Sequence, residues 1–265
     1  MKYPTLLKNM PARFEVSKKN ILIAATGFAS LGLVACAALD ESFAPPPEQL
    51  RAASLSAWDG IKQQERVSND SAYLDRMNRV APRIIVAAGG NPAEWEVVVF
   101  DSDQLNAFAL PGGKIGFYTG ILDLMANDDQ IAAVMGHEVA HVTFNHSAKR
   151  AGRAIQTQSG LSVAQIALGV GGVGNAGLWM QAFGLGAQVG NALPFSRSHE
   201  SEADREGLRY MVKANYNPDE AVRFWQRMSE SKGDGAPPEF LSTHPADETR
   251  IRKLQEEIDL IKAGS

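Results

Sequence analysis

Disulfide bonds cannot stabilise this 265-residue chain, because its sequence contains a single cysteine, Cys36. An excess of positive charge is also absent, since 26 lysine and arginine residues stand against 30 aspartate and glutamate residues, a net charge of −4 at pH 7. Nucleic-acid-binding proteins typically carry a basic surface, so we expect no nucleic-acid partner. The length suffices for a sizeable core, and stability must come from packing or from a bound metal ion.

Two histidines lie four residues apart in the segment 136–141, with Glu138 between them. On a helix, positions four apart differ by about 40° around the axis, so the rings of His137 and His141 can bind one metal ion. Glu138 projects at an adjacent angle, where its carboxylate can take a proton from water activated by that ion. The segment therefore predicts a metal-binding, catalytic helix.

The residues before this segment predict that the helix is buried. Asn127 suits the N-cap position, and Gln130 follows at the third helical position. Apolar residues then supply a side that would pack into the protein: Ile131, Ala132, Val134, Met135 and Val139. A rigid, buried helix is the platform that metal ligands require.

A catalytic zinc ion usually has three protein ligands and one position open to water. A second predicted helix, after Pro194, carries Glu200 and Asp204 one turn apart. We predict that Glu200 is the third ligand and that Asp204 accepts the other N–H of a zinc-bound histidine. Glu202 points about 160° away from Glu200 around the helix and ranks below it. The alternative is that Glu200 and Asp204 belong to an acidic helix face exposed to solvent. The paired histidines of the first helix make this alternative the less favoured one.

Charged residues are missing between residues 154 and 196, where glycine is abundant. A single membrane crossing there would leave His137 and Glu200 on opposite sides of the bilayer. Polar residues also disfavour a lipid-facing hairpin: Gln158, Gln165, Asn175, Gln181 and Gln188. We expect a glycine-rich segment with short helices beside the cleft, and its role as a gate or as a contact for a membrane or partner stays open.

These residues resemble the gluzincin pattern of zinc peptidases, in which His-Glu-x-x-His precedes Glu-x-x-x-Asp. Further matching strings lie at residues 106–109, 113–120, 136–142, 200–204 and 243–245. As a set they are similar to the HtpX-like and CAAX-prenyl-endopeptidase family, most of all to its periplasmic members such as LoiP and BepA. The resemblance covers roughly residues 70 to 255.

The resemblance implies one zinc ion per chain and a zinc metalloendopeptidase that hydrolyses peptide bonds by metal-activated water. Its protein or peptide substrates would be misfolded or unassembled proteins of the bacterial cell envelope. The alternative is an outer-membrane assembly chaperone that keeps the peptidase fold with little turnover. The assembly machinery of the outer membrane is a candidate partner.

The N-terminal residues predict export and lipidation. Lys18 and Lys19 precede an uncharged run that ends in LVAC at Cys36. This pattern is typical of a signal peptide, here residues 1–35, rather than of a spanning helix. The last four residues resemble a bacterial lipobox, which would make Cys36 the lipidated first residue, and a lone buried thiol is the alternative. Residues 36–47 would form a proline-rich tether. Alanine rather than aspartate follows the cysteine, at Ala37, and in this the sequence resembles lipoproteins at the periplasmic face of the outer membrane.

Residues 48–265 are expected to form a single zinc metallopeptidase domain. Apolar residues recur at helical spacing from residue 48 to about 88, with a break at Asn69 and Asp70. Three strands are predicted at residues 95–100, 106–110 and 114–118, and a Pro-Gly-Gly hairpin signal joins the last two. The expected fold class is α+β and mainly helical, and the resemblance implies a zincin-like metallopeptidase with a small β-sheet beside the metal-binding helix.

The same resemblance predicts where a substrate binds. In zincins, an edge strand beside the metal helix pairs with the extended backbone of the substrate. Such main-chain pairing depends little on the substrate's sequence. The strand after residue 105 or its partner would have this role, so the candidate substrate-binding residues are Asn106, Ala107, Phe108 and Ala109.

Two further histidines have different expected roles. His146 lies five residues after His141, about 140° around a helix, so we expect it to pack or cap rather than bind metal. His244 precedes Pro245, which suits the first position of a last helix, where the helix dipole disfavours a charged imidazole. A neutral His244 would be catalytic as a donor to the developing oxyanion, or would occupy the open zinc position as a reversible plug. The choice between these two roles of His244 stays open, and a histidine that only caps the helix is the third alternative.

Overall fold

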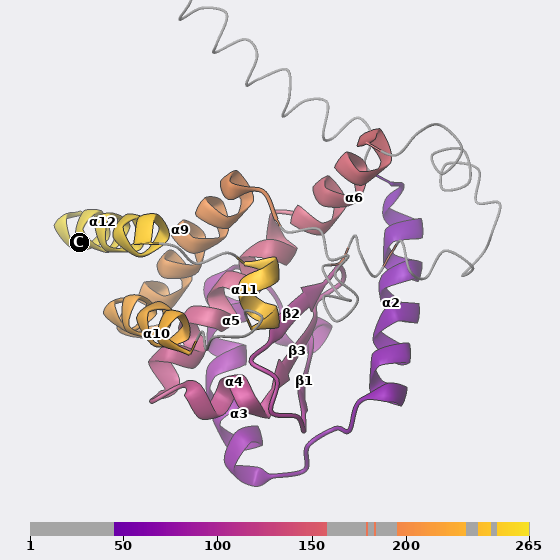
Figure 1. Ribbon diagram of the computed structural model, residues 1–265, viewed down its shortest axis with the longest axis horizontal. Coiled ribbons are helices and arrows are strands. Elements are labelled where there is room, and N and C mark those ends of the chain that lie inside the picture. The colour runs from indigo at the N-terminus through magenta and orange to yellow at the C-terminus, as the bar shows by residue number, and fades with distance from the viewer. Residues whose placement is uncertain are drawn as a thin grey trace, which may run out of the picture. The chain divides into compact units, whose positions relative to one another are not determined.

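Figure 1 shows the computed structural model of the chain. It describes residues 45–157, 179, 183, 195–231, 238–244 and 248–264, all within the unit formed by residues 41–265. The expected signal peptide, Cys36 and most of the glycine-rich segment lie outside the described residues. Among the described residues, no helix is both long enough and apolar enough to cross a membrane.

Two N-terminal helices confirm the helical pattern expected between residues 48 and 88. They are α2, Pro47–Gln64, and α3, Ser71–Ala87. Asp70, in the expected break, caps α3 by accepting a hydrogen bond of 2.8 Å from the N–H of Ala72. α2 begins at Pro47, inside the segment expected to be a tether, because proline fits the first helical turn, where its missing N–H leaves no unmade bond.

A small mixed sheet has three strands in the order β1-β3-β2. The bounds are Glu96–Phe100 for β1, Ala107–Leu110 for β2 and Lys114–Tyr118 for β3, and the 3-10 helix η1, Pro92–Glu94, precedes them. β2 pairs antiparallel with β3, which confirms the expected hairpin, and β1 pairs parallel with β3. Gly112 and Gly113 turn the chain with φ of 83° and 74°, which glycine adopts without strain.

Helices cover both faces of this sheet (Figure 1). Phe108 and Leu110 of β2 pack with Trp58 of α2 in one cluster of buried residues. Ala107 and Ala109 alternate with them and join the main core, which also contains the buried residues of α3 and α5, Asp128–Thr143. The predicted metal-binding helix therefore lies against strand β2, as expected.

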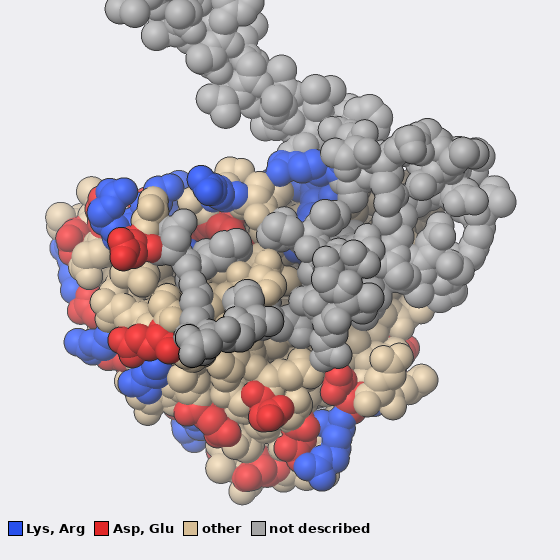
Figure 2. Space-filling model, in the orientation of Figure 1, with Lys and Arg blue, Asp and Glu red and all other residues tan. Residues whose placement is uncertain are grey.

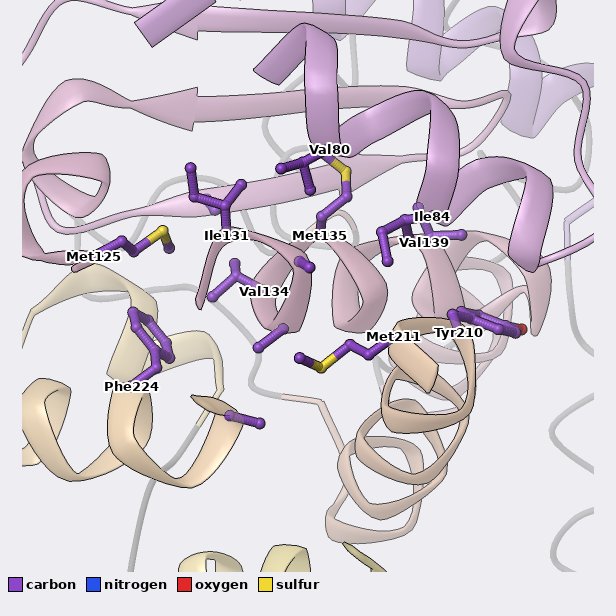
Figure 3. Packing of buried hydrophobic residues seen from close by; sticks show 14 of the residues in the cluster. Val80, Ile84, Met125, Ile131, Val134, Met135, Val139, Tyr210, Met211 and Phe224 are labelled. Atoms are coloured by element: carbon purple, nitrogen blue, oxygen red, sulfur yellow. The ribbon is translucent and has the colours of Figure 1, made fainter. Parts of the chain in front are cut away.

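Six more helices complete the described part of the chain. They are α4 Thr119–Leu124, α6 His146–Thr157, α9 Arg197–Lys213, α10 Asp219–Glu230, α11 Glu239–Thr243 and α12 Glu248–Ala263. Residues 130–141 of α5 are all buried, and Figure 3 shows Val134 and Met135 among side chains of α3, α9 and α10. Each fully buried apolar side chain of this size contributes about 1.5–3 kcal/mol. α5 is therefore stabilised from all sides, and the expected α+β, mainly helical class is confirmed.

α5 and α9 approach each other closely at two glycines. A Cβ on Gly207 would lie 2.9 Å from the backbone nitrogen of His137, and one on Gly136 would lie 2.9 Å from the carbonyl oxygen of Gly207. Any side chain at either position would push the helices apart. The glycine pair therefore allows α9 to lie directly beside the histidines of α5.

Candidate metal centre

α5 presents both predicted histidines toward one point. It begins as predicted, because Asn127 accepts a 2.9 Å hydrogen bond from the N–H of Gln130, whose side chain accepts one of 2.9 Å from the N–H of Ala126. The helix then carries His137 and His141 into the interior, where their side chains are 3% and 1% exposed. Their Nε2 atoms lie 3.0 Å apart, so one ion can contact both.

α9 brings the predicted carboxylate to these rings. Ser196 caps the helix by accepting a hydrogen bond of 3.2 Å from the N–H of His199. Glu200 follows in the first turn, with its Oε1 3.4 Å from His141 Nε2 and its Oε2 3.5 Å from His137 Nε2. The structure thus places all three predicted ligands together.

His244 also reaches this cluster, from the end of α11. Its Nδ1 lies 3.0 Å from Glu200 Oε1 and 3.2 Å from His137 Nε2. His244 directly follows the short helix α11 and donates its N–H to the carbonyl of Phe240. The described part of α12 begins at Glu248. Residue 245 lies outside the described residues. The expected start of the last helix at Pro245, and with it the dipole argument for a neutral ring, stays a prediction.

The four side chains fit the geometry of a metal site. Ligand atoms about 2.0–2.2 Å from a tetrahedral ion lie about 3.3–3.6 Å from one another, and the pairs above lie 3.0 to 3.5 Å apart. The buried group of candidate ligands consists of His137, His141, Glu200 and His244, with ligand atoms all within 4.8 Å of one another. Imidazole-rich donor sets suit zinc and other transition metals better than magnesium or calcium. The residues therefore fit a divalent transition-metal ion.

Comparison with known families agrees with this geometry. The profile of Peptidase family M48 matches residues 72–258. The chain belongs to this family. The matched range contains all four residues of the buried group of candidate ligands.

Similar relatives include two mitochondrial metalloendopeptidases and a bacterial protease. The chain is 38% identical to mitochondrial metalloendopeptidase OMA1 of Schizosaccharomyces pombe over 200 residues, 70% of this chain and 56% of the relative. For OMA1 of Saccharomyces cerevisiae, the identity is 32% over 209 residues, 72% of this chain and 58% of the relative. For the β-barrel assembly-enhancing protease of Escherichia coli K12, it is 27% over 259 residues, 90% and 52%. The chain thus spans little more than half the length of these relatives.

These matches refine the expected resemblance. Similarity to BepA, the β-barrel assembly-enhancing protease, is supported. Similarity to OMA1 was not expected from the sequence motifs. A closer relationship to HtpX, to the CAAX prenyl endopeptidases or to LoiP stays a prediction.

Asp204 contacts one of the candidate ligands. Its Oδ1 lies 3.0 Å from His137 Nδ1. Burial lowers the pKa of His137, but the carboxylates of Glu200 and Asp204 outweigh burial and raise that pKa to about 9. Burial raises the pKa of Asp204, but Arg250 and His137 outweigh it and hold that pKa below its usual value. The charges of the site therefore stabilise one another.

Sequence reasoning missed Arg250, which lies on α12. Its guanidinium donates to Asp204 through Nε at 2.8 Å and Nη2 at 2.7 Å, and its Nη1 lies 2.8 Å from Glu200 Oε2. The guanidinium carbon lies 3.7 Å from the centre of the Trp225 ring on α10. No local pattern distinguishes Arg250 from the other basic residues, because only the packing of α12 brings it to the site.

Arg150 on α6 is a second buried cation. Its guanidinium carbon lies 3.6 Å from the centre of the Phe195 ring, and burial lowers its pKa to about 9 although Glu200 and Glu138 oppose that effect. On the face drawn in Figure 2, acidic and basic side chains both occur at the surface. Arg150 and Arg250 are instead inside, where they balance part of the negative charge of the site.

Glu138 lies beside the candidate ligands. Its side chain is 1% exposed, and its Oε1 is 3.5 Å from His244 Nε2 and has no hydrogen-bond partner among the described residues. Burial raises the pKa of Glu138, while His244 and His137 act in the opposite direction. A buried carboxylate with raised proton affinity beside a metal site is suited to take up and release a proton.

His146 is not among the candidate ligands, but its surroundings differ from the expectation. α5 ends at Thr143, and Asn145 turns the chain with a φ of 54°, so that His146 begins α6. The angle calculated for one continuous helix therefore does not apply. The Nδ1 of His146 lies 2.9 Å from Nδ1 of His141, the ring nitrogen of that candidate ligand that faces away from the cluster.

The expected substrate-binding residues lie in β2 or directly before it. The residues themselves are at most 5% exposed: Asn106, Ala107, Phe108 and Ala109. The Phe108 ring also stacks against Phe100, with ring centroids 6.3 Å apart. These four side chains are buried, so a substrate would have to pair with the main chain of β2, at the edge of the described sheet. That pairing stays a prediction.

Proposed function

We propose that this chain is a zinc-dependent endopeptidase in which His137, His141 and Glu200 hold the ion. The convergence of these side chains from α5 and α9 on one buried point, in a member of family M48, carries the proposal. Zinc bound there supplies a Lewis acid that polarises a peptide carbonyl and lowers the pKa of water to about 7.

The protein groups have separate roles in hydrolysis. Glu138 takes the proton of the attacking water and returns it to the leaving amine. Asp204 accepts the Nδ1–H of His137, which leaves Nε2 of that ring as the ligand atom. Arg250 contacts Asp204 and one oxygen of Glu200, and it keeps both carboxylates charged in a buried site.

Chelator-sensitive proteolysis tests this function. Purified protein that contains one zinc ion should cleave unfolded casein, and a chelator should abolish cleavage until zinc is added back. Cleavage that survives complete removal of zinc would contradict the proposal. Prevention of casein aggregation without cleavage would favour the assembly chaperone with little turnover, a role that the name of the E. coli relative suggests.

We also propose that the protein works in the bacterial cell envelope, anchored by a lipid at Cys36 to the periplasmic face of the outer membrane. Support comes from the LVAC motif and from the similarity to BepA. Its substrates would be misfolded or unassembled envelope proteins, with the outer-membrane assembly machinery as a partner.

Replacement of Cys36 tests the lipid anchor. Cys36→Ser should move the protein from the membrane fraction to the soluble fraction, because lipid chains rather than a spanning helix would hold it there. Immunoblots of both fractions measure the change, and wild-type protein from the same cells is the control. A serine variant that stays with the membranes would argue against lipidation.

His244→Ala distinguishes the two roles proposed for His244. The Nδ1 of this ring lies within the ligand cluster and its side chain is 3% exposed, which favours the reversible plug. The rate of casein hydrolysis at saturating zinc should therefore rise. The expected factor is one divided by the fraction of wild-type molecules in which His244 does not occupy the open zinc position. A fall in the hydrolysis rate of a fully zinc-loaded variant would instead identify His244 as the donor to the oxyanion.

A further inference from the structure

The partner of the second ring nitrogen differs between the two histidines of α5. His137 Nδ1 contacts a carboxylate, whereas His141 Nδ1 lies 2.9 Å from Nδ1 of His146. His146 Nε2 in turn lies 3.0 Å from Oε2 of Glu202. A chain of contacts thus runs from the ring of His141 through a second imidazole to a carboxylate on α9.

One arrangement of hydrogens satisfies every contact in this chain. His141 Nε2 must be unprotonated to bind an ion, so the hydrogen of the neutral ring is on Nδ1 and is donated to His146 Nδ1. His146 then carries its own hydrogen on Nε2 and donates it to Glu202. A doubly protonated His146 would instead oppose two N–H groups across 2.9 Å.

Aromatic contacts hold both rings in this orientation. The His199 ring stacks on His146 at a centroid distance of 4.5 Å and an angle of 11°, and the His146 side chain is completely buried. The Phe195 ring stacks on His141 at 3.9 Å. The two Nδ1 atoms therefore meet in a rigid part of the site, where α5, α6 and α9 come together.

We propose that His146 and Glu202 are positioning residues that fix the tautomer and the orientation of His141, so that zinc affinity depends on both of them. This inference rests on the proposed role of His141 as a zinc ligand. The position of Glu202 around α9 excludes it from the metal ligands. Its carboxylate instead supports His141 through His146, on the side of the His141 ring away from the ion. A ligand-supporting hydrogen bond of this kind typically changes metal affinity by about 10–100-fold.

The two ligand supports differ in strength. The side chain of Asp204 is 11% exposed and contacts His137 directly, whereas that of Glu202 is 31% exposed and acts through a neutral imidazole. Water competes more readily for the exposed carboxylate. Loss of Glu202 should therefore weaken zinc binding less than loss of Asp204.

Two substitutions of His146 separate positioning from packing. His146→Phe keeps a flat ring against His199 but leaves the N–H of His141 without its acceptor, so zinc affinity should fall about 10–100-fold. His146→Asn loses the ring but keeps an oxygen acceptor near the position of Nδ1, and it should recover much of the affinity. A role in packing alone predicts the reverse order. Competition with a chromophoric zinc chelator measures affinity, and thermal unfolding of the zinc-free protein monitors folding.

Substitutions on α9 provide the matched comparison. Glu202→Ala should weaken zinc binding measurably, Asp204→Ala should weaken it by about 10–100-fold, and Glu206→Ala, whose carboxylate pairs with Arg209, should leave it unchanged. Wild-type affinity in His146→Phe or in Glu202→Ala would overturn the inference while the proposed function stands. If His146→Phe does not fold, Glu202→Ala decides. A wild-type protein that binds no zinc would overturn both.

Discussion

Glu138→Gln is expected to lower casein hydrolysis by about 10²–10⁴-fold while zinc stays bound. Glutamine keeps the shape of the side chain but cannot take up the proton of the attacking water. The ligand atoms belong to other residues, so the substitution leaves the ion's donors in place. Hydrolysis rates and the zinc content of the purified variant check the two halves of this prediction.

Glu206→Gln is a matched control for this substitution. Glu206 lies on α9 and pairs with Arg209, so the same chemical change there should leave the hydrolysis rate unaltered. A Glu138→Gln protein that holds one zinc ion and cleaves casein at the wild-type rate would refute the assignment of Glu138, because another group would then have to carry the proton.

The second large effect is expected from Arg250→Met, which should lower the free energy of unfolding of the zinc-free protein by about 3–5 kcal/mol. Methionine keeps an unbranched stem against Trp225, but Glu200 and Asp204 lose the guanidinium that contacts both. The two carboxylates are only 7% and 11% exposed, so water compensates poorly for the lost partner. Urea unfolding in the presence of a chelator measures the difference.

Zinc and a neighbouring arginine provide the controls for Arg250. Added zinc should restore part of the stability, because an ion that binds only the folded state stabilises it in proportion to RT ln(1 + [Zn]/Kd). Arg252→Met, on the same helix, removes an exposed pair with Glu256 and should change the free energy of unfolding by no more than about 1 kcal/mol. Equal stability of Arg250→Met and the wild type would show that Arg250 does not stabilise the buried carboxylates.

Features that depend on neighbours along the chain were predictable from the sequence alone. His137 and His141 share one side of α5 because helix geometry requires it, whatever surrounds the helix. The caps at Asp70 and Asn127 and the hairpin between β2 and β3 follow from local turn and capping chemistry. The position of Glu200 and Asp204 one turn apart also follows from helix geometry and could be recognised in the sequence.

Only the tertiary structure decided which distant side chains meet the histidines. Arg250 reaches Asp204 because α12 packs beside α9. His146 reaches His141 because Asn145, in the left-handed conformation, turns the chain between α5 and α6. His244 ends a short helix that the sequence pattern did not reveal.

The sequence by itself determined most of the helices and strands and the shared side of the two histidines of α5, whereas the tertiary structure decided which distant side chains complete the site. Helix geometry and capping act over a few residues, so they can be recognised in the sequence. The crossing of α5 and α9 depends on steric fit at Gly136 and Gly207 and on burial summed over the whole core. Contacts of that kind have no local signature, which is why Arg250 and the support of His141 emerged only from the folded chain.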